Sequence, residues 1–178
     1  MPISDIYDKH FCTFGKQFNI KKLLLKSIGI VESDLNPRAY RMEPLFWERY
    51  LKNNPEWSDK DPKIVSASHG ICQLMFTTAW SLGLTGEIEK VRDDLLDPTI
   101  NIMLAAKMMR LLIDKSIKKE YSNKYYWLSN AAIALAQWNG GSRGNPGEDG
   151  VLRNQKYVRK VLKQWGALKA VERECDPD

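Results

Sequence analysis

The sequence predicts a mostly α-helical fold with at most a minor β element, organised as one domain over residues 1–178. The length of 178 residues is usual for one domain. Hydrophobic residues make up 43% of the chain, a typical globular value that argues against collagen-like, disordered and simple coiled-coil chains. Several segments also place apolar residues at three- and four-residue steps, which is the spacing of one helix face.

The first such helix is expected over residues 19–32, and its apolar face contains Ile20, Leu23, Leu24, Ile28 and Val31. Asn36-Pro37 ends this helix, because a residue that precedes proline avoids the helical region of backbone conformation. A second helix is expected from Pro44, with Phe46, Trp47, Tyr50 and Leu51 on one side, until residues 53–55 (NNP) end it. Residues 55–68 are polar and irregular, and at most one short strand is expected there, at residues 64–65.

Four further helices are expected in the rest of the chain. One covers residues 74–82 and stops at Gly83. Asp97-Pro98 is a cap followed by a first-turn proline, and it opens a helix to about Lys115 that is apolar on most of its circumference and is therefore expected to be buried. An alanine-rich helix follows at residues 130–138, and the last helix covers residues 153–165.

The charge of the chain suggests an anionic partner. With 27 Lys and Arg against 22 Asp and Glu, the formal net charge is +5. Such a surface attracts nucleic acid, an acidic membrane or a bacterial wall, and charge does not choose among them. The mean hydropathy of −0.44 and the absence of a long uncharged apolar stretch argue against a membrane-spanning helix. Cys12, Cys72 and Cys175 are widely spaced without a CxxC pair, so we expect free thiols.

Glu32 does not fit the pattern of its helix. It lies four residues beyond Ile28 and eight beyond Leu24, so it extends the apolar stripe. A carboxylate at the end of a buried face loses hydration, which raises its pKa toward the range of a general acid. Spacing alone leaves open the alternative that Glu32 turns outward in a frayed last turn.

Five segments, in order, resemble motifs of the soluble lytic transglycosylases, relatives of goose-type lysozyme. Residues 32–39 (ESDLNPRA) resemble the family's ES-x-x-N-P-x-A segment, and residues 70–75 (GICQLM) resemble G-L-M-Q-x-M. Residues 97–102 (DPTINI) are similar to D-P-x-x-N-I. Residues 134–141 (ALAQWNGG) and 157–162 (YVRKVL) resemble A-x-A-x-Y-N-x-G and Y-V-x-x-V-L. The resemblance covers about residues 19–165 and implies a lysozyme-like helical domain.

The resemblance also implies an activity. The family cleaves the β-1,4 bond between N-acetylmuramic acid and N-acetylglucosamine in peptidoglycan, so glycan strands are the expected partner. Glu32 would protonate the glycosidic oxygen and then accept the proton of the muramyl 6-hydroxyl, which closes a 1,6-anhydro ring. No metal or organic cofactor is implied.

By the same resemblance, Tyr157 would orient the Glu32 carboxylate as a second catalytic residue. Ser33, Gln73, Met75, Trp138 and Asn139 would contact substrate or shape the cleft. The residues alone favour ordinary packing for Tyr157, and they also favour core packing over sugar stacking for Trp57, Trp80 and Trp138. His69 has no metal-ligand spacing to His10 and is expected to make a local hydrogen bond.

The chain departs from the family pattern at three places. Cys72 stands where methionine is usual, and Trp138 stands where tyrosine is usual. An insertion at about residues 42–65 separates the first two motifs, and it contains Glu43, Glu48, Asp59 and Asp61. A second carboxylate among these acids that activated water would make the enzyme a hydrolytic lysozyme (muramidase). The simpler interpretation is that they solvate a surface.

A rival from another class is a non-catalytic module that binds murein or nucleic acid through basic faces at residues 21–22, 118–119 and 156–163. No nucleic-acid motif accompanies these charges, so we expect no nucleic-acid partner. A monomer without stable membrane insertion is expected. The target is the cell wall or periplasm, while residues 1–8 (MPISDIYD) do not form a secretory signal. A phage enzyme, released by a membrane-permeabilising partner or carried in the virion, is therefore expected.

Overall fold

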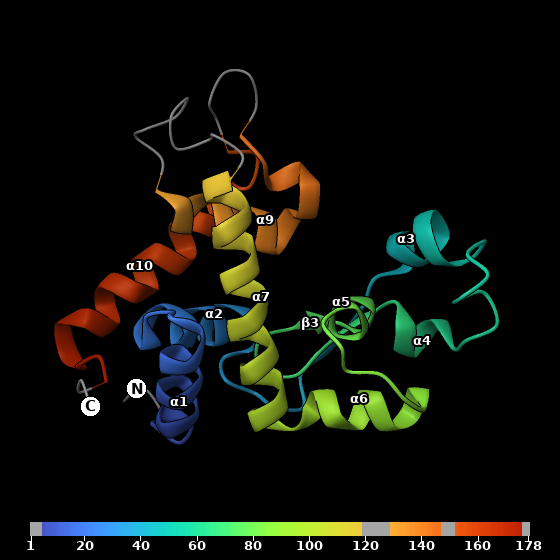
Figure 1. Cartoon of the computed structure of the whole chain (residues 1–178), viewed down its shortest axis with the longest axis horizontal. Coiled ribbons are helices and arrows are strands. Elements are labelled where there is room, and N and C mark those ends of the chain that lie inside the picture. The colour runs from blue at the N-terminus through green and yellow to red at the C-terminus, as the bar shows by residue number, and fades with distance from the viewer. Residues whose placement is uncertain (1–4, 119–128, 147–151, 176–178) are drawn as a thin grey trace. The chain divides into compact units, whose positions relative to one another are not determined.

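The computed structural model describes residues 5–118, 129–146 and 152–175 (Figure 1). Contacts between residues group the chain into two compact units. Unit 1 comprises Met1–His10 and Ile28–Ala105, and unit 2 comprises Phe11–Ser27 and Ala106–Asp178. The chain passes from one unit to the other within three helices, α1 (Asp8–Phe18), α2 (Lys22–Ser33) and α7 (Pro98–Lys118).

The described residues are mostly helical, which confirms the predicted fold class. Besides the three helices above, they form α3 (Pro44–Phe46), η1 (Trp47–Leu51), α4 (Pro62–Val65), α5 (Phe76–Ser81), α6 (Ile88–Leu96), α9 (Asn130–Gly140), η2 (Gly141–Gly144) and α10 (Gln155–Val171). The predicted helices correspond to α2, α3 with η1, α5, α7, α9 and α10. α10 continues six residues past its predicted end at Trp165, and α1 and α6 were not predicted.

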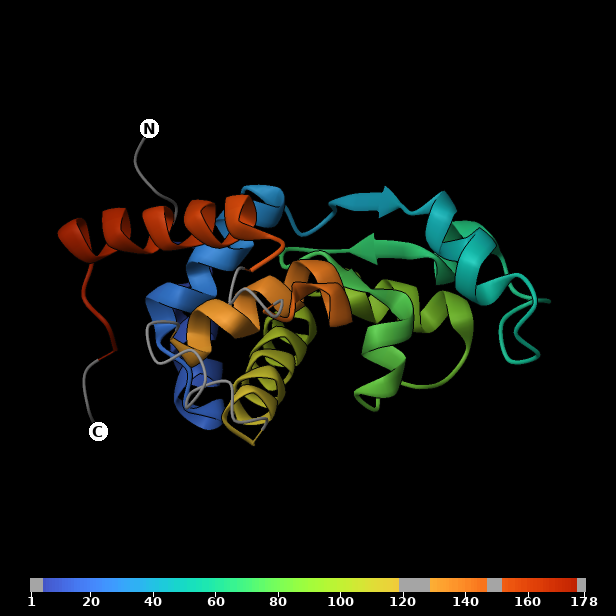
Figure 2. The same cartoon turned by 90° about the horizontal axis from the view of Figure 1, so that it is seen from above.

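A small antiparallel sheet lies in unit 1 and has the order β1-β2-β3. β1 (Tyr40–Met42) pairs with β2 (Ala67–His69), and β2 pairs with β3 (Leu74–Met75). Figure 2 shows β1 and β2 running in opposite directions. The prediction of a strand at residues 64–65 is wrong, because these residues belong to the helix α4. The Asp61 side chain caps the start of this helix by accepting a hydrogen bond from the Lys63 N–H at 2.8 Å.

The predicted helix at residues 44–51 has an unexpected geometry. It starts as α3 at Pro44 and continues as a π-helical turn, η1, in which the Lys52 N–H donates to the Trp47 carbonyl at 3.0 Å. Both elements lie in the segment predicted to be an insertion, which connects β1 to β2. β1 and β2 pair as antiparallel strands across this long connection.

The core of unit 1 is an aromatic and aliphatic layer beside the sheet. α5 contacts β2 and β3, and α4 and α6 contact β2 (Figure 1). Trp57 is buried and packs edge-on against Phe76 and Trp80, whose rings lie 6.1 and 5.4 Å away. This arrangement confirms core packing for Trp57.

Unit 2 is organised around α9, which contacts both η2 and α10. The small side chains of α9 are buried, and Gly144 of η2 lies directly against its backbone, where a Cβ atom would collide with the Ala136 carbonyl. In the part of the chain that the structure describes, no helix is long and apolar enough to cross a bilayer.

The chain segment after α10 is attached to the first helices in unit 2. The buried Lys26 ammonium donates to both carboxylate oxygens of Glu172, at 2.8 and 2.9 Å. A disulfide joins Cys12 of α1 to Cys175, with a Cα–Cα distance of 5.7 Å. The expectation of free thiols is therefore wrong for this pair, because the fold brings together cysteines 163 residues apart, and it is right for the buried Cys72.

Candidate active site

Glu32 lies in the last turn of α2 and is half-buried. The residues that precede it on the same stripe, Leu24 and Ile28, are buried. The helix ends directly after Ser33, because Asp34 and Leu35 both adopt positive φ angles, 55° and 62°. Glu32 is therefore held on the final helical turn, at the end of a buried face, as its spacing predicted.

Ser33 attaches this helix end to the turn that carries Gln73. Its hydroxyl donates to the Ile71 carbonyl at 2.7 Å. Residues 70–73 form the tight connection between β2 and β3, and the Gln73 N–H and side-chain amide both donate to the Gly70 carbonyl. The Glu32–Ser33 pair and the Gln73 turn, 38 residues apart in sequence, are thus neighbours in unit 1.

The Gln73 turn requires unusual backbone conformations. Gly70 has a φ of +75°, and a Cβ atom at this position would collide with the Asn101 amide and the Leu95 carbonyl. Gln73 itself has a φ of +49°, which is uncommon for a residue with a side chain. Such strain persists only where the surroundings determine the conformation.

Asn101 supplies that constraint, and the sequence reasoning did not select it as a site residue. Its buried amide donates to the His69 carbonyl at 2.9 Å and to the Leu95 carbonyl at 2.8 Å. Its oxygen accepts from the Cys72 N–H at 2.9 Å. Asn101 is the Asn of the D-P-x-x-N-I motif, so the sequence did mark this residue. A motif at a helix start does not reveal, however, which distant loop the Asn side chain holds.

The charge of Glu32 affects the pKa of the Cys72 thiol. Burial raises the pKa of its thiol far above the ordinary value, and the negative charge of Glu32 raises it further. Cys72 therefore stays a neutral thiol at physiological pH. It provides an apolar, uncharged neighbour for the carboxylate, as the methionine that is usual at this position would.

Met75 and His69 lie on the two strands that the turn connects. Met75 follows on β3, and its sulfur accepts a hydrogen bond from the Ser68 hydroxyl at 3.2 Å. His69 is buried and its Nε2 lies 3.1 Å from the Ile64 carbonyl, which confirms the expected local hydrogen bond. Burial lowers the pKa of His69; the Ile64 hydrogen bond opposes this effect and the charge of Arg92 adds to it.

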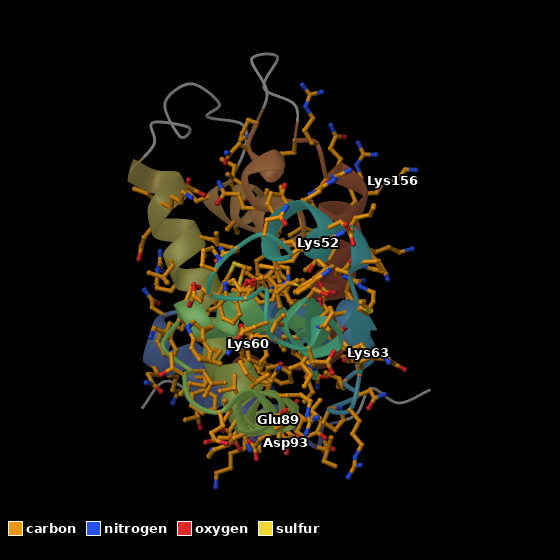
Figure 3. The ribbon with its side chains drawn as sticks, turned by 90° about the vertical axis from the view of Figure 1, so that its right-hand side faces the viewer. Lys52, Lys60, Lys63, Glu89, Asp93 and Lys156 are labelled. Carbon is orange, nitrogen blue, oxygen red and sulfur yellow. A yellow bond between two sulfur atoms is a disulfide. The ribbon has the colours of Figure 1, made fainter. Side chains whose placement is uncertain are left out.

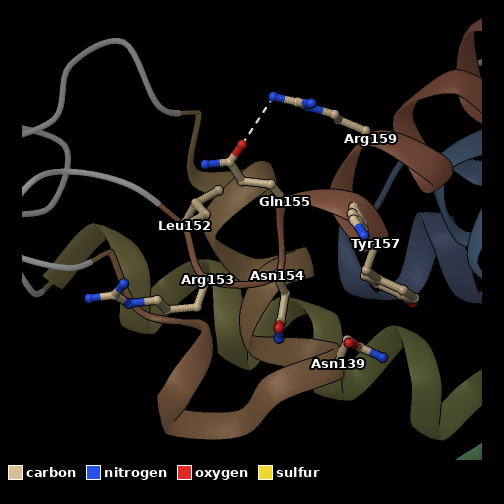
Figure 4. A pocket seen from close by; sticks show the side chains of 8 residues that line it. Asn139, Leu152, Arg153, Asn154, Gln155, Tyr157 and Arg159 are labelled. Carbon is tan, nitrogen blue, oxygen red and sulfur yellow. Dashed lines mark hydrogen bonds between the residues drawn. The ribbon is translucent and has the colours of Figure 1, made fainter.

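The remaining predicted site residues belong to unit 2. Trp138 and Asn139 lie in the last turn of α9, and Tyr157 lies in the first turn of α10. Asn139 and Tyr157 line one open cavity of about 640 Å³ (Figure 4). Trp138 is half-buried and is not among the residues that line this cavity. The structure therefore divides the predicted residues between the two units, and in unit 2 it brings Asn139 and Tyr157 into one cavity.

Within the described ranges, no group of three or more His, Cys, Asp and Glu side chains is placed to hold a metal ion. The chemistry available at Glu32 is proton transfer by a carboxylate beside a rigid turn that presents an amide side chain.

Comparisons with known proteins identify the family of this chain. A search of curated proteins found no match. The family model described as the Transglycosylase SLT domain matches residues 11–146, well over half of the chain. The match includes Glu32, the Gln73 turn and Asn139, and it ends before Tyr157. Together with the helical fold and the Glu32 helix end, this match shows that the chain belongs to the SLT transglycosylase family, whose lysozyme-like domains cleave the peptidoglycan of the cell wall.

Proposed function

We propose that the protein is a peptidoglycan lytic transglycosylase in which Glu32 alone performs the acid and base steps and yields 1,6-anhydro-muramyl products. The observation that carries this proposal is the attachment of the Glu32–Ser33 helix end to the Gln73 turn through the Ser33–Ile71 hydrogen bond. It holds a half-buried carboxylate next to a turn that carries a polar side chain, and partial removal from water favours the protonated form that a general acid needs.

The proposed reaction has two proton transfers. Protonated Glu32 donates to the glycosidic oxygen while the bond from that oxygen to C1 of the muramyl sugar breaks. The resulting carboxylate then accepts the proton of the 6-hydroxyl as this oxygen bonds to C1. Glu32 ends in its starting state, and no water is consumed.

The other site residues have proposed supporting roles that follow the family resemblance. Gln73, Met75, Trp138 and Asn139 contact the sugar chain, and Tyr157 orients the carboxylate. Ser33 is proposed to act mainly by position, because its hydroxyl already donates to Ile71. The Tyr157 proposal rests on its motif alone, since the matched family region ends before it.

The insertion bears on the alternative of a hydrolytic lysozyme, which needs a second carboxylate to activate water. Glu43 pairs with Arg41 at 2.6 Å. Glu48 and Asp59 pair with Lys52 and Lys60, each at 3.0 Å, and the Lys60 hydrogen bond lowers the pKa of Asp59. Asp61 caps α4. Each of the four acids thus has a local structural partner, which supports the single-carboxylate reaction.

The test of Glu32 is its isosteric replacement. Glu32→Gln should reduce the release of soluble fragments from purified murein by at least about a hundredfold, because the amide cannot donate the required proton. Glu89→Gln, an exposed acid on α6 (Figure 3), is the matched control and should keep full activity. Undiminished activity of Glu32→Gln would remove this residue from the chemistry.

Mass spectrometry of the fragments tests the outcome of the reaction. Terminal 1,6-anhydro-muramyl groups are expected, and reducing ends alone would show a hydrolase. If the products carry 1,6-anhydro groups, Glu43→Gln should keep the activity of the wild type within about threefold. If walls mixed with the wild-type protein bind it without any loss of turbidity, the protein is a murein-binding module.

A further inference from the structure

The cavity in unit 2 is lined by three cationic side chains. Arg153, Lys156 and Arg159 contribute to it together with Asn139 and Tyr157. In Figure 4, Arg153 lies at one end of the lining, and Asn139 and Tyr157 lie at the other. All three cations are exposed, and Lys156 projects from the start of α10 (Figure 3).

Among the described residues, these charges have no carboxylate partner of the kind found on other helices. α6 and α7 each contain an ion pair four residues apart, Lys90–Asp94 and Arg110–Asp114. Residues 152–171 include no Asp or Glu at all. Within the described segments, no carboxylate forms an ion pair with any of the three cations, and Arg159 instead donates to the Gln155 amide at 3.0 Å.

The position of the cations has a cost for the helix. Arg153 and Lys156 flank the first turn of α10, and this turn contains no acidic residue. A helix N-terminus carries a partial positive charge, so cations there reduce helix stability. The N-cap residue Asn154 does not compensate, because its side chain donates to the Ala136 carbonyl at 3.1 Å instead of capping α10. Within the described ranges, cations without a carboxylate partner at such a place suit an anionic ligand.

We propose that this cavity binds carboxylates of the peptide stem that the muramyl sugar carries. The inference rests on the proposed function, in which Tyr157 orients the carboxylate that acts on the muramyl residue. The stem is attached to that same sugar, and Tyr157 and the cations line the same cavity. Arginine forks match carboxylates geometrically, and separated cations suit the several carboxylates spaced along a stem.

The test removes the positive charges that line the cavity by substitutions that should leave the fold unchanged. The triple variant Arg153→Gln, Lys156→Gln, Arg159→Gln removes the three charges. The control variant Lys21→Gln, Lys115→Gln, Lys163→Gln removes three exposed charges of unit 2 that do not line the cavity, so both variants lose the same net charge. The cavity variant should melt at or slightly above the wild-type temperature, because cations leave the helix N-terminus.

Two substrates then measure how much the stem carboxylates contribute to substrate binding. One is a muramyl tetrasaccharide that bears peptide stems, and the other is the same compound after its stem carboxylates are amidated. The cavity variant should raise KM about tenfold for the native stems and less than twofold for the amidated stems, with kcat unchanged, because each exposed ion pair contributes modestly. The control variant should change neither value by more than about twofold.

A binding experiment keeps this inference separable from the proposed function. In a two-dimensional NMR titration, the free stem peptide should shift the amide signals of residues 153–159 in the wild type and not in the cavity variant. If the wild type cleaves neither substrate, the proposed function fails and the titration alone decides the inference. An equal KM increase for both substrates, or amide shifts with inorganic phosphate and none with the stem peptide, would overturn it.

Discussion

Asn101 is one buried side chain that holds three backbone groups around the Gln73 turn. Its contacts reach His69, Cys72 and Leu95 at 2.8–2.9 Å. The turn contains two residues with positive φ, so it depends on these contacts for its shape. Asn101 thus fixes the shape of the turn that carries Gln73.

Asn101→Ala should reduce the free energy of unfolding by about 3 kcal/mol or more, because it leaves one buried N–H and two buried carbonyls without their partner. Urea denaturation measures this change. Asn53→Ala, at an exposed position of the insertion, is the control and should change stability by no more than about 0.5 kcal/mol. Equal stability of the two variants would contradict the role of Asn101.

His69 links stability to pH at the residue scale. Burial lowers its pKa in the folded protein, so the unfolded chain takes up a proton more readily as the pH falls below about 6.5. The stability that His69 contributes is therefore present above pH 6.5 and is lost as the pH falls from there toward the lowered pKa.

Thermal melts between pH 7.5 and 5.0 test this linkage. We expect Tm to fall with pH in the wild type and in His10→Gln, which removes the other histidine. His69→Gln keeps a side-chain donor for the Ile64 carbonyl, and its Tm should fall less steeply. Identical slopes in all three proteins would show that His69 does not titrate on unfolding.

At the scale of elements, the end of α10 depends on an ion pair with α2. Lys26 is 0% exposed and its ammonium is paired with Glu172, the C-cap residue of α10. Two further hydrogen bonds, from the Leu23 N–H to Glu174 and from Lys22 to the Arg173 carbonyl, attach the same segment. The final helix is therefore held at its C-terminal end by polar contacts.

Glu172→Gln should reduce the free energy of unfolding by about 3–5 kcal/mol, because it removes the carboxylate that pairs with the buried Lys26 ammonium. For a chain of this size the loss corresponds to about 10 °C in Tm, measured by circular dichroism. The double variant Lys26→Met, Glu172→Leu removes both charges and should recover most of the loss. A double variant as unstable as Glu172→Gln would show that the site needs the ion pair itself.

At the scale of the whole molecule, the Cys12–Cys175 disulfide joins the first helix to the last described residue. Reduction, or Cys12→Ser, should lower the free energy of unfolding by about 2–4 kcal/mol, because the unfolded chain regains the freedom of a very long loop. A reductant should have no further effect on Cys12→Ser. Thiol titration of the non-reduced protein should find one thiol, Cys72, and only after unfolding. Three titratable thiols would contradict the disulfide.

Local sequence patterns determined the fold class, most helices and the position of Glu32, because periodicity, caps and proline act over a few neighbouring residues. α6 was missed although Val91 and Leu95 are buried at helical spacing. The family assignment also came from short segments, and the model match confirms it. The single domain, the monomer, the roles of the site residues and the phage origin stay predictions.

Only the tertiary structure decided which distant groups meet. Cys72 and Asn101 are 29 residues apart, Lys26 and Glu172 are 146 apart, and Cys12 and Cys175 are 163 apart. No local pattern marks such partners, because each pair is selected by the path of the whole chain. Arg153, Lys156 and Arg159 lie within four residues of Tyr157 in the sequence, whereas only the fold brings Asn139 to the same cavity.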